Sequence, residues 1–168
     1  MPTRFIAVLL VALVLAGCSS APHALTLVET KSPVQLLRNE AWYRLPDVMI
    51  KADNETTDES LACDDSGALR LWRSSTVALV TNSQAPRVVI AGDDLAASFV
   101  AQGWEAARSE EGAAVLTVLT RTTSVAVIEI EAVEKTEAHR ASIRITASGP
   151  CVQTAGADSD EVRNLERD

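Results

Sequence analysis

The chain opens with its longest apolar run, the twelve residues from Phe5 to Ala16, which follow the positive charge of Arg4. A membrane-spanning helix needs roughly 20 apolar residues, so this run is too short to cross a bilayer. A positive start, a short apolar centre and small residues at its end are typical of a secretory signal. Residues 1–17 are therefore predicted to be a signal peptide.

Farther along, polar and apolar residues alternate in the pattern of β-strands that bury one face. The alternating segments span residues 68–81, 113–120, 124–133 and 139–148. In the third segment, Ile128 and Ile130 share one face, whereas Glu129 and Glu131 share the other. The pattern predicts an antiparallel sheet with one covered and one solvated face. On the solvated face, Glu129 or Glu131 is expected to pair with Arg144 of the next strand.

A first amphipathic helix is predicted over about residues 33–45. Ser32 is suited to cap it, Pro33 to occupy its first position and Pro46 to end it. Its apolar stripe consists of Val34, Leu37, Ala41 and Leu45. We expect this helix to dock onto the domain; the alternative is that it holds a partner.

The clearest helix signal covers residues 93–102. Asp93 and the acid after it place negative charge where the helix dipole favours it. Gly103 stands where a left-handed cap is needed, and Trp104 is placed to pack back on Phe99. Trp104 is therefore interpreted as a core residue and not as a ligand-stacking platform.

Two stretches lack a clear period. Residues 51–60 are rich in Asp and Glu and are predicted to be a solvated loop. The loop does not fit a calcium site: with Asp53 first, Asp58 stands where an EF-hand needs glycine, and Asp64 where it needs a bidentate Glu. Residues 87–92 fit either an extended strand or a helix entry.

These elements predict an α+β fold: a two-layer sandwich in which an antiparallel sheet of about four strands is covered by one main helix, with an extra N-terminal helix. Because the middle of the chain has enough Val, Ile and Leu for one core, a single domain is expected over residues 32–153. Residues 18–31 are predicted to be a flexible tether. Residues 154–168 are predicted to be a disordered tail.

The sequence is acidic, with a formal net charge of −8. Removing residues 1–17 deletes one arginine and no acid, so the remaining chain carries −9. Such a surface disfavours nucleic acid, whose binding depends on Lys and Arg. It also disfavours adhesion to anionic lipid head groups. No nucleic-acid partner is expected.

The end of the apolar run, Leu15-Ala16-Gly17-Cys18, resembles the lipobox of bacterial lipoproteins. In that family the cysteine thiol is joined to diacylglycerol and the chain is cut just before it. The resemblance implies that acylated Cys18 binds membrane lipid and anchors the protein outside the cytoplasm. The anchor would be on the outer face of the cell membrane, or on the outer membrane if the host has one, which Ser19 permits. A cleaved signal followed by a chance cysteine is the alternative.

With Cys18 assigned to the lipid, Cys63 and Cys151 remain as an even pair in an oxidising compartment. A disulfide between them is predicted. It would close a loop of about 90 residues and stabilise the fold by roughly 4–5 kcal/mol. The alternative is a reactive Cys63 thiol with His139 as its base, which leaves Cys151 without a role.

A second resemblance covers about residues 60–153. The stretch DDLAASFVAQGW, followed by paired strands and then IRITASGPCV, is similar to a group of small lipoproteins of high-GC Gram-positive bacteria. These proteins share a helix that ends in Gly-Trp and a last strand that ends in Gly-Pro-Cys. The resemblance implies the same fold and location and a host with a single membrane, and it transfers no site residue.

Motifs for common catalytic chemistries are missing from the sequence. It contains no G-x-S-x-G elbow, phosphate loop, dinucleotide fingerprint or H-E-x-x-H motif. Its two histidines, His23 and His139, lack a second ligand at zinc spacing. No catalytic residue, cofactor or metal site is therefore predicted, and an enzyme is not expected.

Two functions from different classes fit these features. The first is a non-enzymatic interaction or accessory module of the cell envelope, which meets another envelope protein through its solvated sheet face or an exposed edge. The second is a small-ligand-binding lipoprotein with a pocket between the sheet and helix 93–102, or beneath helix 33–45. A cavity between the layers would favour the second function, and an exposed apolar patch the first.

Overall fold

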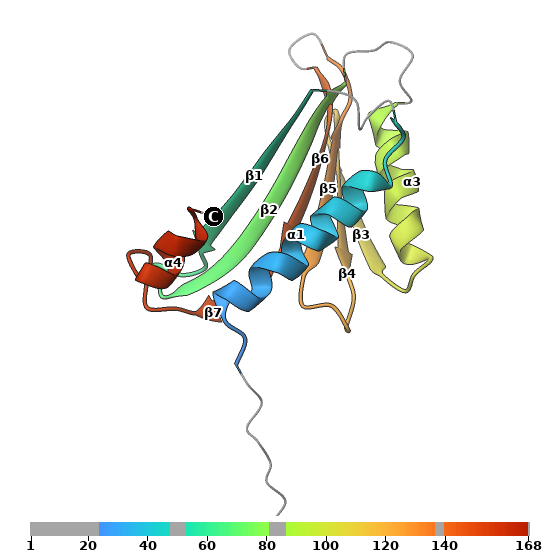
Figure 1. The fold of residues 1–168 in the computed structure, drawn as a ribbon. Coiled ribbons are helices and arrows are strands. Elements are labelled where there is room, and N and C mark those ends of the chain that lie inside the picture. The colour runs from blue at the N-terminus through green and yellow to red at the C-terminus, as the bar shows by residue number, and fades with distance from the viewer. Residues whose placement is uncertain (1–23, 48–52, 81–86, 137–139, 168) are drawn as a thin grey trace, which may run out of the picture.

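The computed structural model describes residues 24–47, 53–80, 87–136 and 140–167, which form two layers (Figure 1). The sheet has seven strands: β1 (Asp53–Ala62), β2 (Leu69–Val80), β3 (Glu105–Glu111), β4 (Ala114–Thr120), β5 (Val127–Val133), β6 (Ala141–Ser148) and β7 (Val152–Gln153). The helices are α1 (Leu27–Tyr43), α3 (Val88–Val100) and α4 (Asp160–Leu165). The predicted α+β class is confirmed, but the sheet is larger than the expected four strands.

The sheet is antiparallel, in the order β1-β2-β6-β5-β4-β3, and the short β7 pairs with the start of β2. Four strands were predicted by their alternation: β2, β4, β5 and β6. Strands β3 to β6 follow one another as a meander, and β6 then pairs with β2. The early β1–β2 hairpin is thus added to the side of the later meander.

The helices of the described ranges, α1, α3 and α4, pack on one face of the sheet. Buried and half-buried residues alternate along β2, and the buried ones include Trp72 and Ala78. Helices α1 and α3 cover the buried side of β2, β4, β5 and β6 (Figure 1). Helix α4 completes this layer by placing Val162 against Trp72. The opposite side, which we call the open face, has no helix over it in the part of the chain that the structure describes.

Three strands were not predicted: the two-residue β7, and β1 and β3, which lie at the two edges of the sheet. Residues 51–60, expected to be a loop, mostly belong to β1, which pairs with β2 over its whole length. Strand β3 is exposed at every residue. An edge strand has a neighbour on one side only, so main-chain hydrogen bonds can hold it without an apolar face. The polar sequences of both strands therefore carry no hydrophobic period.

Helix α3 begins at Val88 and not at Asp93, so residues 87–92 are a helix entry. Gly92 lies inside the helix because α3 approaches β5 closely there: a Cβ on Gly92 would stand 3.3 Å from the Cβ of Ala132. Asp93 is consequently in the second turn of the helix. Its carboxylate accepts a hydrogen bond from Arg108 of β3 at 3.1 Å.

The predicted end of this helix is confirmed. Gly103 has a φ of 86°, and the N–H of Trp104 donates to the carbonyl of Phe99 at 3.2 Å. The rings of Phe99 and Trp104 meet edge to face, with centroids 5.5 Å apart. Because both side chains are buried, this turn fixes the end of α3 in the core.

Helix α1 begins at Leu27, within the expected tether of residues 18–31. Thr26 caps it: its side chain accepts from the N–H of Glu29, whose carboxylate in turn accepts from the N–H of Thr26. Pro33 therefore lies in the second turn and not at the first helical position. The predicted docking is correct, because Val34 and its stripe pack against β2 and β6.

Residues 154–168, expected to be disordered, contain helix α4. Ser159 caps it by accepting from the N–H of Val162 at 3.4 Å. Val162 is fully buried. Lys31 of α1 also donates to the carbonyl of Leu165 at 2.9 Å. The charged composition of this segment predicts disorder, but one buried valine and one long-range hydrogen bond hold the short helix against the rest of the domain.

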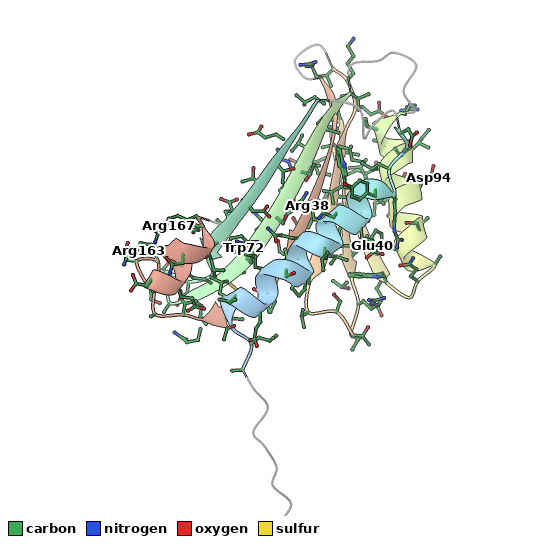
Figure 2. The ribbon with its side chains drawn as sticks, viewed as in Figure 1. Arg38, Glu40, Trp72, Asp94, Arg163 and Arg167 are labelled. Atoms are coloured by element: carbon green, nitrogen blue, oxygen red, sulfur yellow. A yellow bond between two sulfur atoms is a disulfide. The ribbon has the colours of Figure 1, made fainter. Side chains whose placement is uncertain are left out.

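The core consists of two apolar clusters with polar residues between them. One cluster includes Phe99 of α3, and the other includes Trp72 (labelled in Figure 2) together with residues of α1 and α4. Between them, Arg38 of α1 reaches across the sheet and donates to Ser74 Oγ at 3.0 Å. Its guanidinium is also 3.8 Å from the carboxylate of Asp58. This contact ties α1 to the edge strand β1.

The predicted disulfide is present. Cys63 directly follows β1 and Cys151 directly precedes β7, and their Cα atoms are 6.2 Å apart. Within the same β1–β2 turn, Asp64 accepts from Ser66 Oγ at 2.6 Å and from the N–H of Leu69 at 3.2 Å. These hydrogen bonds, that of Ser66 above all, lower the pKa of the Asp64 carboxyl below its usual value.

None of the helices in the described ranges is both long and apolar enough to span a membrane. The predicted signal peptide and the predicted lipid attachment site, Cys18, lie outside the described residues.

Replacing both disulfide cysteines, Cys63→Ser together with Cys151→Ser, should lower the free energy of unfolding by about 4 kcal/mol, because the bond closes a loop across 88 positions. Urea unfolding followed by circular dichroism measures the loss. Reducing the unaltered protein should produce a similar loss. A decrease below about 1 kcal/mol in both experiments would contradict this assignment of the bond's contribution.

The variant Val162→Ala should lower the free energy of unfolding by about 2 kcal/mol, since it leaves a cavity among buried side chains. Val28→Ala is the matched control, because Val28 is 53% exposed on α1 and its truncation should cost almost nothing. Equal effects of the two substitutions in the same urea titration would show that α4 is not part of the folded core.

Candidate functional site

A groove of about 380 Å³ lies on the open face of the sheet. Five strands contribute alternate side chains to it. Its lining consists of Glu55, Thr57 and Glu59 of β1, Arg73, Ser75 and Val77 of β2, Leu116 of β4, Glu129 and Glu131 of β5, and Arg144 and Thr146 of β6. Because neighbouring strands hold these residues in register, main-chain hydrogen bonds fix the positions from which the side chains project.

Two arginine–glutamate pairs lie across the groove. Arg73 of β2 is directly opposite Glu59 of β1, and their charged atoms are 2.6 Å apart. Arg144 of β6 is directly opposite Glu131 of β5 at 3.5 Å. The second pair confirms the expected contact between Arg144 and an acid of the preceding strand. Both pairs are partly exposed, so water screens their attraction.

A row of hydroxyl groups separates the two ion pairs. Thr57, Ser75 and Thr146 are consecutive cross-strand neighbours on β1, β2 and β6. Ser75 Oγ and Thr146 Oγ1 are 3.0 Å apart and share a hydrogen bond. The row continues into Glu129, which is opposite Thr146. The middle of the groove is therefore lined by donors and acceptors, all on short side chains apart from Glu129.

Negative charge dominates the groove. It contains four carboxylates and two guanidinium groups, and the guanidiniums pair with Glu59 and Glu131. Within the described part of the chain, Glu55 and Glu129 have no ion-pair partner. Val77 and Leu116 add apolar surface, and Leu116 is 37% exposed. The groove thus combines unbalanced acidity with exposed aliphatic side chains.

The groove lies on the side of the sheet opposite to the expected ligand pocket. Between the layers, where that pocket was expected, large side chains are buried: Phe99, Ile128 and Ile143 are fully buried and Ile130 is 1% exposed. The close approach of Gly92 to β5 leaves little space beneath α3. The contact between helices and sheet is therefore packed as a core.

The predicted site residues do not enter the groove. Cys63 and Cys151 are joined to each other, so Cys63 is not a free thiol, and His139 lies outside the described residues. Sequence reasoning placed Glu131 and Arg144 on the solvated face, but it missed Glu55 and its neighbours because β1 was taken for a loop. The spacing of acidic and threonine residues in β1 was the only signal available, and on its own it fits a loop equally well.

Metal ligands do not gather in the described part of the chain: no group of three or more His, Cys, Asp or Glu residues there is placed to hold an ion. The adjacent acids of β1, Asp58 and Glu59, cannot bind one ion together, because successive side chains of a strand point to opposite faces of the sheet.

No protein-family model, curated protein sequence or solved structure matches this chain. The groove itself therefore supplies the observations from which a function can be argued.

The charge pairs of the groove should contribute little to folding. In a double-mutant cycle with Arg144→Gln and Glu131→Gln, we expect a coupling free energy below about 1 kcal/mol, because both side chains are half exposed. Urea unfolding of the four proteins measures it. A coupling above about 2 kcal/mol would mean that the pair is a structural element, and groove variants could then not be used to test binding.

Proposed function

We propose that this protein is a lipid-anchored, extracytoplasmic module of the cell envelope that performs no catalysis and meets a protein partner through the open face of its sheet. The lipobox-like sequence before Cys18 supports the anchor. The groove supports the binding role, because it offers charged, hydroxyl and aliphatic groups together on a rigid surface.

One observation carries the proposal: the helices are distributed unevenly over the sheet. In an antiparallel sheet whose only role is to form the core, one face packs against helices and the other can carry polar residues alone. Here the uncovered side also holds aliphatic residues, such as Val77 and Leu116, beside unpaired carboxylates. Mixed polar and apolar surface of this kind is what protein interfaces use.

A small-ligand role is the second candidate, and the volume of the groove favours it, since ligand pockets begin at roughly 300 Å³. Such pockets are mostly apolar and bury most of their ligand. This groove is open to solvent and lined largely by polar residues. A protein partner, which brings its own apolar surface to close the groove, fits these properties better.

The proposal is tested by placing the photo-crosslinking amino acid benzoylphenylalanine at Val77, inside the groove, in cells that produce the full chain. Illumination should yield one discrete adduct, which should also form from Thr57 and lose most of its intensity in the Arg144→Glu variant. Immunoblotting measures the adduct, and mass spectrometry identifies the partner.

The matched control places the same amino acid at Leu36, which is 65% exposed on the outer side of α1. No adduct of that size should form there. Absence of an adduct from both groove positions, or the same adducts from Leu36, would contradict the proposed use of the open face.

A further inference from the structure

Strand β1 is an edge strand whose outer side has no pairing partner in the described ranges. It is ten residues long and pairs with β2 on its other side. Its sequence, DNETTDESLA, contains no proline and no lysine, the residues that commonly protect an edge. Helix α4 lies near the end of β1 (Figure 1), so the free part of this edge lies toward the start of the strand.

The opposite edge, β3, differs in its charges. Arg108 at its centre pairs with Asp93 of α3 at 3.1 Å and also with Glu110 of its own strand. Its hydrogen bonds to Glu110 and to Asp93 raise the pKa of Arg108, and both of these partners belong to the same chain. None of the groove residues belongs to β3. Of the two edges, only β1 is continuous with the candidate site.

Charge decides which strand can be added to β1. The strand carries acids on both faces, Glu55 and Glu59 toward the groove and Asp58 toward Arg38. It has no basic residue. A second copy of this chain would bring acid against acid, which is unfavourable between directly opposed residues. A strand that carries Lys or Arg would instead place its cations beside these carboxylates.

The geometry of a sheet places such cations in the groove. A strand added beside β1 lies about 4.8 Å away and sends every second side chain to the open face. These side chains would flank Glu55, Thr57 and Glu59. Glu59 already pairs with Arg73, whereas the neighbour of Glu55 on β2 is the aliphatic Val77. Glu55 is therefore the carboxylate that gains most from a new cation.

We infer that β1 binds an extended basic segment of a partner by strand addition, with Lys or Arg side chains on the open face against Glu55 and Glu59. This inference rests on the proposed function, because it specifies the chemistry of the partner that meets the open face. Main-chain hydrogen bonds along β1 supply affinity, and the carboxylates select for basic residues.

The test uses the peptide Lys-Thr-Lys-Val-Lys-Thr-Lys, blocked at both ends, and nitrogen-15-labelled protein that begins after the signal peptide. On addition of peptide, the outward main-chain amides of β1 should exchange their hydrogens more slowly, by about tenfold at saturation, while those of β3 should not change. Two control peptides should produce no protection: one N-methylated at every residue, so that neither of its edges can pair with β1, and one with Glu in place of every Lys.

The variant Glu55→Lys should weaken binding of the lysine peptide by about tenfold, through loss of one attraction and gain of one repulsion. Glu105→Lys makes the same change of charge on the exposed edge β3 and should alter the affinity by less than about twofold. Glu55→Gln, with a smaller disturbance of the fold, should give an intermediate loss. Thermal unfolding of each variant confirms that the affinities refer to folded protein.

Equal binding of the N-methylated peptide, or equal effects of Glu55→Lys and Glu105→Lys, would reveal diffuse electrostatic attraction and overturn the inference. Failure of the lysine peptide to protect β1 would overturn it as well. A discrete groove adduct at Val77 in that case would leave the proposed function standing. Protection of β1 by the peptide without any adduct in cells would have the opposite meaning: the edge binds basic strands, but the envelope function fails.

Discussion

The structure depends on an unequal division of apolar residues between the two faces of one sheet. Trp72, Ile128 and Ile145 point to one side, and their burial requires that every helix lie there. Apolar burial of this kind is the main favourable term in folding. Once α1, α3 and α4 share that side, no helix of the described ranges covers the other side, and the groove over five strands is a direct result of this arrangement.

The sequence revealed those elements in which the apolar pattern and the main-chain structure agree. Strands β2, β4 and β5 bury alternate residues, and β6 buries Ile143, Ile145 and Ala147 on the same covered face, so their sequences record which face is covered. The end of α3 could also be predicted, because few residues other than glycine adopt the positive φ of Gly103, and because Trp104 is suited to pack on Phe99. Alternation placed Arg144 on the same face as Glu129 and Glu131, and the strand register decides that Glu131 is its partner.

The other elements and the groove could not be predicted from the sequence, because they depend on contacts between residues that are distant in sequence. Strand β1 exists because β2 offers it ten paired positions, and nothing in its own polar sequence records that neighbour. The start of α3 was misplaced because Gly92 and Asp93 resemble a helix entry, whereas Gly92 serves close packing on β5. The groove could not be predicted because its lining combines residues 55–59 with residues 129–146, and only the order of the strands in the sheet brings these segments together.

The contact between α1 and α4 determines where a tag or a support can be attached without covering the groove. Lys31 and Leu165 are joined by a hydrogen bond, so the start of α1 and the end of α4 share one pole of the domain. A purification tag, a fluorescent label or a solid support attached at the start of α1 or at the end of α4 would add its bulk at this common pole. The groove, on the reverse of the sheet, would keep its access to solvent in every such arrangement.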